Sequence, residues 1–292
     1  MDWSEFTPVS FCARAPEQRQ AAAAAACRRY RKAVPLRLPG RRSAVSTDAF
    51  IPYAPLNVLK PVAADVWLVD GPEIRFRFFA GLKLPFPTRM TIVRLPDGGL
   101  WVHSPTEPVE ALIDSVRALG PVRCLVAPSS IHYWWVPDWK ARFPDAEVYA
   151  VDNLERWAKR EFPPHHKLGD AAPVVWAGAI DQVVVAGGVV TEAEFFHRSS
   201  RTLILTDLIE NFEPARVHSR FLRGLLRMAG IADPNGKTPI DMQLSFFRQR
   251  KAVRAAAERM IAWTPERVIM AHGRWYDRNA VAELRRAFRW VL

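Results

Sequence analysis

The stretch EFFHRSSRTLILTDLI, residues 194–209, places a histidine and an aspartate on either side of one short apolar run. Residues 202–206 are apolar or β-branched, which favours a buried strand. His197 precedes this run and Asp207 follows it directly. An acid after a buried strand is costly unless it is paired, bound to a metal or used as a helix N-cap. We therefore treat His197 and Asp207 as candidate site residues, with a helix cap as the alternative role of Asp207.

The same pattern of a polar side chain after an apolar run recurs elsewhere in the chain. His103 and His272 each follow such a run directly, and His132 lies a few residues after another. In α/β folds the loops at strand ends converge on one crevice, where binding sites form. Imidazole and carboxylate groups together suit zinc, iron or manganese. We expect one divalent metal ion, zinc first, with iron or manganese as alternatives.

Strand-like and helix-like segments alternate along most of the chain. The predicted strands are residues 64–69, 91–95, 100–103, 122–126, 147–151, 182–185, 189–196, 202–206 and 267–271. The predicted helices are residues 109–119, with Thr106 as N-cap and Gly120 as terminator, 138–143, 154–162 and several segments after Pro214. This order predicts an α/β protein with sheets inside and helices outside.

Several stretches, in this order, resemble proteins of the metallo-β-lactamase fold. EFFHRSSRTLILTDLI is similar to the stretch that supplies a histidine ligand and then the metal-bridging aspartate, and RVIMAHG, residues 267–273, to the strand that delivers the final histidine. Four further stretches resemble the same proteins: VWLVDGP (66–72), LWVHSPTEP (100–108), LVAPSSIHYWW (125–135) and KLGD (167–170). Over about residues 50–292 the chain most resembles an uncharacterised family, domain of unknown function 4336. The resemblance implies an αββα sandwich of two mixed β-sheets flanked by helices.

The resemblance also implies a set of site residues and an activity. The implied metal ligands are His132, His197, Asp207 and His272. Active members of the superfamily carry His-x-His-x-Asp-His where this chain has PSSIHY, residues 128–133, so the first two histidines are absent. A reduced, single-metal site is therefore expected. Asp207 and Tyr133 are the implied catalytic residues, in a metal-dependent hydrolase that uses a metal-activated water on a small-molecule ester, thioester, lactone or phosphodiester.

Aromatic residues crowd the sequence after His132. Trp134, Trp135 and Trp139 are interpreted as core or lid packing, or as an apolar wall beside the metal that suits an aromatic or acyl substrate. Ser104, in the tripeptide HSP, lacks the glycines of a nucleophile elbow. The sequence therefore shows no nucleophile elbow that would compete with the interpretation of a metal-activated water.

Two alternatives to the hydrolase remain open, one suggested by the charge distribution and one by the missing histidines. The net charge of +11 divides into +5 over residues 1–50, −4 over residues 51–214 and +10 over residues 215–292. Basic ends attract anions, so a nucleic-acid or membrane-surface protein is one alternative, although a solvated arginine-rich surface is the simpler interpretation and disfavours nucleic acid. The missing histidines motivate the other alternative, a catalytically degenerate metal- or ligand-binding member of the same fold.

The chain is predicted to have an arm and one domain. Residues 1–48 combine an alanine run with basic clusters and little apolar periodicity, which predicts a flexible basic arm before a domain of residues 49–292. No apolar run approaches the roughly 20 residues of a transmembrane helix, and none forms a signal-peptide core. We expect a cytoplasmic protein whose three cysteines are reduced.

Overall fold

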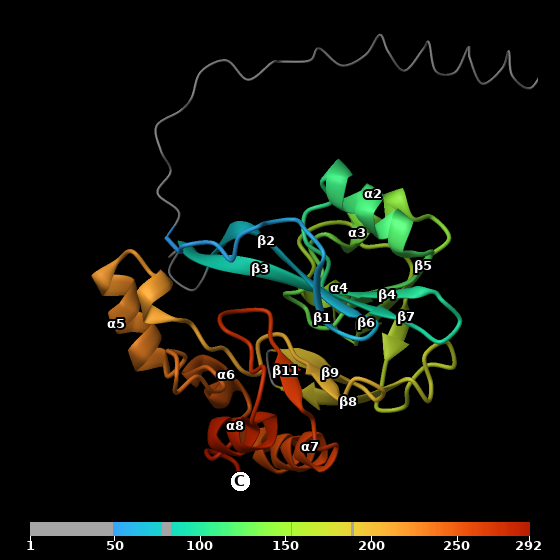
Figure 1. Ribbon diagram of the computed structural model, residues 1–292. Coiled ribbons are helices and arrows are strands. Elements are labelled where there is room, and N and C mark those ends of the chain that lie inside the picture. Colours follow the sequence, from blue (N-terminus) through green and yellow to red (C-terminus); the bar gives the residue numbers. More distant parts are fainter. Residues whose placement is uncertain (1–48, 78–82, 153, 188–189) are drawn as a thin grey trace, which may run out of the picture. The chain divides into compact units, whose positions relative to one another are not determined.

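The computed structural model describes residues 49–77, 83–152, 154–187 and 190–292. These residues form two β-sheets with helices on their outer faces, as the sequence predicts (Figure 1). The predicted flexible arm, residues 1–48, lies outside the described residues. No helix in the described part of the chain is long and apolar enough to cross a membrane.

The larger sheet has seven strands in sequence order. They are β1 (Lys60–Ala63), β2 (Val66–Arg77), β3 (Lys83–Arg94), β4 (Leu100–His103), β5 (Val122–Ala127), β6 (Glu147–Val151) and β7 (His166–Leu168). The first four strands pair antiparallel, and β4 to β7 pair parallel. β2 and β3 extend well beyond the predicted strands. The prediction was too short because Pro72, Pro85 and Pro87 lie within these strands, and proline argues against a strand.

Helices α2 (Glu110–Leu119) and α3 (Val136–Arg142) cover the outer face of this sheet, and the short α4 (Leu154–Trp157) follows β6. α2 buries Leu112, Ile113 and Val116, the apolar stripe that predicts it. It begins later than expected, after Val109, and Thr106 is a buried residue outside the helix instead of its N-cap. α4 is shorter than the predicted segment 154–162.

The smaller sheet has the order β11-β10-β9-β8. Its strands are β8 (Ile180–Ala186), β9 (Thr191–His197), β10 (Thr202–Ile204) and β11 (Arg267–Ile269). β9 is antiparallel to both β8 and β10, whereas β10 and β11 are parallel. Between β10 and β11 the chain forms η2 (Pro214–Arg216), α5 (Arg220–Ala229), α6 (Ile240–Ser245), η3 (Phe247–Gln249) and α7 (Arg250–Ala262), and α8 (Ala280–Ala287) follows β11.

Side chains alternate between two cores along the smaller sheet. Phe195 and Ile204 join the core shared with the larger sheet, whereas Phe196 and Leu203 join the core against α7 and α8. Because successive strand residues point to opposite faces, this alternation separates the layers. The architecture is therefore an αββα sandwich, which confirms the predicted fold class.

Candidate metal centre

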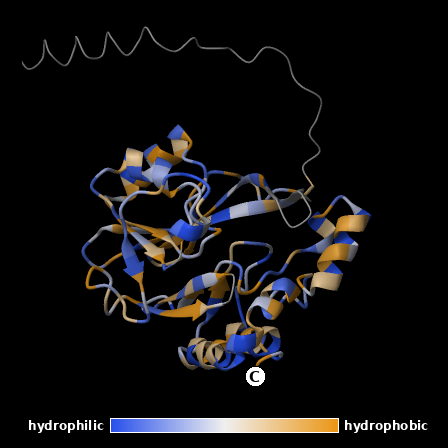
Figure 2. Cartoon of the chain, turned by 180° about the vertical axis from the view of Figure 1, so that it is seen from behind, coloured by the Kyte–Doolittle hydropathy of each residue, from blue (hydrophilic) through white to orange (hydrophobic). Residues whose placement is uncertain are grey.

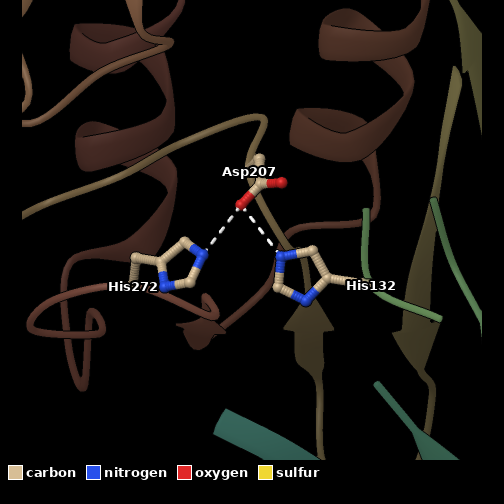
Figure 3. Close-up of side chains that lie close together, drawn as sticks. All are labelled: His132, Asp207 and His272. Carbon is tan, nitrogen blue, oxygen red and sulfur yellow. Dashed lines mark hydrogen bonds and ion pairs between the residues drawn. The ribbon is translucent and has the colours of Figure 1, made fainter. Parts of the chain in front are cut away.

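Three of the candidate residues meet at one point of the sandwich. The Nε2 atom of His132 lies 3.0 Å from Oδ1 of Asp207, and Nε2 of His272 lies 3.1 Å from the same oxygen. Figure 3 shows the two imidazoles approaching that oxygen from different sides. Among the described residues, this is the group whose His and carboxylate atoms lie close enough to share an ion, all within 4.8 Å of one another.

The pairing of β10 with β11 explains why Asp207 and His272 meet. The two strands are parallel, with Ile204 opposite Ile269. Asp207 and His272 each come three residues after this pair, so equal lengths of chain carry both side chains past the same edge of the sheet. The register of two neighbouring strands therefore sets the spacing of these ligands.

His132 reaches the same place through a connection between the two sheets. The loop after β5 leaves the larger sheet, and Ser129 forms an isolated bridge with Glu192 at the start of β9. The backbone N–H of Ala193 donates to the Pro128 carbonyl at 2.8 Å. Because β9 is antiparallel to β10, the start of β9 lies at the end of β10, which brings the loop beside Asp207.

Hydrogen bonds on the far side of each ring fix how the imidazoles present Nε2. Nδ1 of His272 lies 2.8 Å from the Pro87 carbonyl oxygen, which can only accept, so Nδ1 carries the proton. In its neutral form His272 therefore turns an Nε2 lone pair toward Asp207. Nδ1 of His132 lies 2.7 Å from Oγ of Ser104. Such partners orient metal-binding histidines in proteins, so the donor set fits a divalent ion.

The loop that carries His272 is held by close backbone packing. Gly273 has a φ of 87°, and a Cβ there would lie 2.1 Å from the Asn211 carbonyl oxygen, so only glycine fits. The His272 ring packs edge-on against Phe86 at 5.1 Å and parallel to Phe212 at 6.1 Å between centroids. The orientation of His272 is thus fixed by both its backbone and its ring contacts.

Neighbouring groups shift the pKa values of Asp207 and His132. Burial alone would raise the pKa of Asp207, but His132 and His272 outweigh it and lower that pKa below the usual range. Burial alone would lower the pKa of His132, but Asp207, with a smaller effect of Glu192, raises it above its usual value. A cation between these groups would replace the proton that the pair holds, as expected of metal ligands.

Glu192 supports the centre, although sequence reasoning missed it. Its Oε1 accepts the backbone N–H groups of Thr206, Asp207 and Leu208 at 2.8, 2.9 and 3.1 Å. Burial and the nearby Asp207 raise the pKa of this carboxyl. The sequence signal was an acid in an otherwise apolar strand, since Glu192 and Glu194 both occur in β9 and both are fully buried.

The structure places His197, a predicted ligand, apart from the other three. It pairs with Thr202 at the start of β10, whereas Asp207 follows the end of that strand. Its Nδ1 lies 2.7 Å from Oγ of Ser200, and Oγ of Ser199 lies 3.1 Å from its Nε2. β9 is antiparallel to β10, and for this reason the end of β9 points away from the centre.

Tyr133, predicted as a catalytic residue, is also outside the centre. Its hydroxyl accepts the backbone N–H of Lys159 at 2.6 Å, and its ring packs against Phe162 in the core. Neighbouring residues of the turn after His132 point in different directions, so His132 faces Asp207 while Tyr133 faces the larger sheet.

A pocket of about 130 Å³ opens onto the three side chains. A dry protein cavity of roughly 150 Å³ accommodates benzene, so a ring or short acyl chain fits here. The apolar lining comes from Ile74, Phe86, Pro105, Ile131, Trp134, Trp135, Val190, Pro239 and Met242. The polar lining comes from Thr88, Arg89, Ser104, His132, Asp207, Glu210, Asp241 and His272. Trp139 instead lies in the core and donates to the Thr106 carbonyl.

His103 lies in the core near this pocket. It is 2 % exposed, stacks on Trp101 at 5.4 Å between centroids, and has a buried Nε2 without a partner in the described residues. Burial, with a smaller effect of His132, lowers the pKa of His103 to about 3. An unfolded chain binds a proton here near pH 6.5, so between pH 6.5 and 3 the unfolded state holds the extra proton and stability falls as pH falls.

A His103→Phe variant should therefore resist acid better than the wild type. Between these pKa values, His103 lowers the free energy of unfolding by about 1.4 kcal/mol for each unit of falling pH. Lowering the pH from 6.5 to 4.5 should therefore reduce the free energy of unfolding of the wild type by roughly 2–3 kcal/mol more than that of the variant. Urea unfolding at the two pH values measures this difference. Equal losses in both proteins would show that His103 titrates normally in the folded state.

Comparison with known proteins agrees with this architecture. The model of the family described as domain of unknown function (DUF4336) matches residues 77–219. A metallo-β-lactamase from Pontibacter korlensis has a TM-score of 0.52 and 13% identity, covering 80% of this chain and 98% of that one. The mono-zinc form of the metallo-β-lactamase FIM-1 from Pseudomonas aeruginosa has a TM-score of 0.53 and 14% identity, covering 80% and 94%.

A third solved structure gives the same result. A metallo-β-lactamase from Hirschia baltica has a TM-score of 0.51 and 13% identity, covering 80% of this chain and 97% of that one. No match was found among the curated proteins. At such identities the likeness concerns the fold. The chain therefore has the metallo-β-lactamase fold, and just under half of it, residues 77–219, matches the model of the domain of unknown function DUF4336.

Proposed function

We propose that the protein is a metal-dependent hydrolase that holds one divalent ion, preferably zinc, through His132, Asp207 and His272. One observation carries the proposal: two imidazole Nε2 atoms from separate loops converge on a single oxygen of Asp207. Three protein ligands of these types, beside an open pocket, are the usual composition of a catalytic zinc site. His197 and Tyr133 have no part in this proposal.

The residues around the ligands have separate roles in this proposal. An ion bound here would supply an acidified water and polarise a carbonyl oxygen. In the tautomer of His132 that would bind an ion through Nε2, Nδ1 carries the proton and donates it to Oγ of Ser104, 2.7 Å away. Glu210 lines the same pocket, and its buried Oε2 has no partner in the described residues. Burial, then the charge of Asp207, raises its pKa well above the usual value, which favours the protonated acid and suits Glu210 to give a proton to the leaving group.

The pocket lining favours an uncharged substrate with an apolar body. Trp134, Trp135 and Met242 form apolar walls, while Glu210 and Asp241 add acidic groups. Arg89 also lines the pocket, but its guanidinium is bound to Asp70 and to backbone carbonyls. The Asp241 carboxylate repels a phosphodiester more than a neutral ester, thioester or lactone. We therefore propose an acyl or aryl ester, thioester or lactone as the substrate class.

Metal analysis of purified protein, with an activity panel, tests the proposal. The wild type should bind about one equivalent of zinc and hydrolyse neutral acyl esters, thioesters or lactones faster than a phosphodiester. Asp207→Asn and His272→Ala should weaken zinc binding by more than the roughly 10–100-fold typical of changes around metal ligands, and should abolish turnover. His197→Ala is the matched control, and it should bind zinc and substrate as the wild type does.

Three outcomes would contradict the proposal in different ways. A metal-free wild type that also fails to take up zinc would remove the metal centre. Bound zinc without turnover on any substrate would favour the binding-only member of the fold. Loss of zinc in His197→Ala but not in Asp207→Asn would place the ligands elsewhere.

A further inference from the structure

Exposed apolar side chains concentrate in one part of the described chain. Phe221, Met228, Ile240, Leu244 and Phe247 are 53–74% exposed, and they are half of the ten large hydrophobic side chains that the described residues expose. All five lie between β10 and β11, on α5, α6 and η3, away from α2 and α3 (Figure 1). Clustering of this kind marks an interaction surface more often than scattered single exposures do.

Helix α5 has some apolar residues in the core and others exposed on the surface. Leu222 and Leu226 are buried, in a small core with Phe212 and Val217. Phe221 and Met228 are not needed there, since they are 74% and 72% exposed. They are seven residues apart, which is two helical turns, so they share one side of α5. Figure 2 shows hydrophobic and hydrophilic residues alternating along this helix.

Arginines run beside this apolar stripe. Arg220 and Arg227 are both exposed and are also seven residues apart, one position before Phe221 and Met228. α5 contains no acidic residue, and neither arginine has an ion pair within the described residues. Residues 216–251 hold eight Lys and Arg but two Asp and Glu. The partner of this surface is therefore expected to be anionic.

We propose that α5 docks the protein on an anionic membrane surface, with Phe221 and Met228 inserted among the lipid chains and Arg220 and Arg227 at the headgroups. An apolar stripe flanked by arginines is the pattern of helices that lie in the membrane interface. Charge disfavours two other occupants: a second copy would present the same basic face, and residues 1–47 carry nine basic but three acidic side chains. The aliphatic Met228 suits lipid better than nucleic acid.

Vesicle co-sedimentation of the full chain tests this inference independently of the metal chemistry. Wild-type protein should bind phosphatidylcholine vesicles that contain phosphatidylserine, more weakly at high salt, and should bind pure phosphatidylcholine poorly. Phe221→Ser/Met228→Ser and Arg220→Ser/Arg227→Ser should each lower the partition coefficient by roughly tenfold or more.

Control variants remove the same residue types elsewhere. Ile51→Ser/Val174→Ser removes two exposed apolar side chains, and Arg117→Ser/Arg278→Ser removes two exposed arginines. Both should bind vesicles within about twofold of the wild type. All variants should keep the wild-type melting temperature to within a few degrees, because every changed side chain is exposed.

Several results would overturn the inference. One is a wild type that ignores anionic vesicles, and another is an equal loss of binding in the controls and the α5 variants. A gel shift with short DNA or RNA that the α5 changes abolish, with vesicle binding intact, would assign the surface to nucleic acid. A dimer in sedimentation that only the α5 variants dissociate would assign it to a second copy.

Discussion

An Arg89→Met variant is expected to lose about 3–5 kcal/mol of unfolding free energy and to bind zinc roughly 10–100-fold more weakly. Arg89 is 4 % exposed in β3 and pairs with Asp70 of β2 at 2.8 Å. Its Nη1 donates to the carbonyl oxygens of Met270 and Gly273, both at 2.8 Å. These carbonyls flank His272, so one buried guanidinium ties the larger sheet to the loop that presents this ligand.

Methionine fills similar volume but leaves two buried carbonyl groups without their donor, and it leaves the buried Asp70 carboxylate with the partly exposed Lys60 as its ion-pair partner. Removing one member of a buried ion pair is much worse than replacing both. For a domain of this size the loss corresponds to a melting temperature lower by about 10 °C. Zinc titration measures the weaker zinc binding, which we expect because without Arg89 the loop of His272 can move relative to Asp207.

Lys60→Met is the matched control for Arg89→Met. Lys60 also pairs with Asp70 at 2.8 Å, but its side chain is 25% exposed, and its second hydrogen bond goes to the Tyr53 carbonyl instead of the carbonyls that Arg89 binds. Solvent weakens such a pair, so its loss should cost no more than about 1 kcal/mol and leave zinc binding unchanged. Equal effects of the two variants would mean that Arg89 acts only through the charge of Asp70.

Most of the layered architecture could be predicted from the sequence, because each layer has a local signal. The run from Leu203 to Thr206 and the apolar stripe of α2 both identify elements by residue pattern alone. The long β2–β3 ladder could not be predicted in full, since its prolines conceal the strand pattern that pairing across the sheet supports. Tertiary pairing there outweighs local propensity.

The site was only partly predictable, for a related reason. A polar residue at the end of a strand is visible in sequence, but the direction of that strand in the sheet is not. Asp207 and His272 end two parallel strands and meet, whereas His197 ends an antiparallel strand and lies at the opposite edge. The sequence around Ser104 allows a test for a nucleophile elbow but does not reveal its role beside His132. Its hydrogen bond to His132 depends on a contact across 28 residues of chain.

Replacing Glu192 by alanine should be the other severe change, with a loss of about 3–5 kcal/mol in unfolding free energy. One oxygen of Glu192 accepts three successive backbone N–H groups around Asp207. Alanine would leave all three donors buried without an acceptor, at about 1–3 kcal/mol each, partly offset by relief of the buried acid. Chemical unfolding measures the loss, and zinc titration should show weaker binding because the Asp207 backbone is no longer fixed.

Two glutamine variants separate the acceptor role of Glu192 from its charge. Glu192→Gln keeps an oxygen in place, so it should retain most of the stability that the alanine variant loses. Glu194 is equally buried two residues later, and burial, then Glu192, raises its pKa well above the usual value. This shift favours the protonated acid, which glutamine matches in shape and charge, so Glu194→Gln should change stability by less than about 1 kcal/mol. If Glu192→Gln were as damaging as Glu192→Ala, the charge of Glu192, not its hydrogen bonds, would hold Asp207 in place.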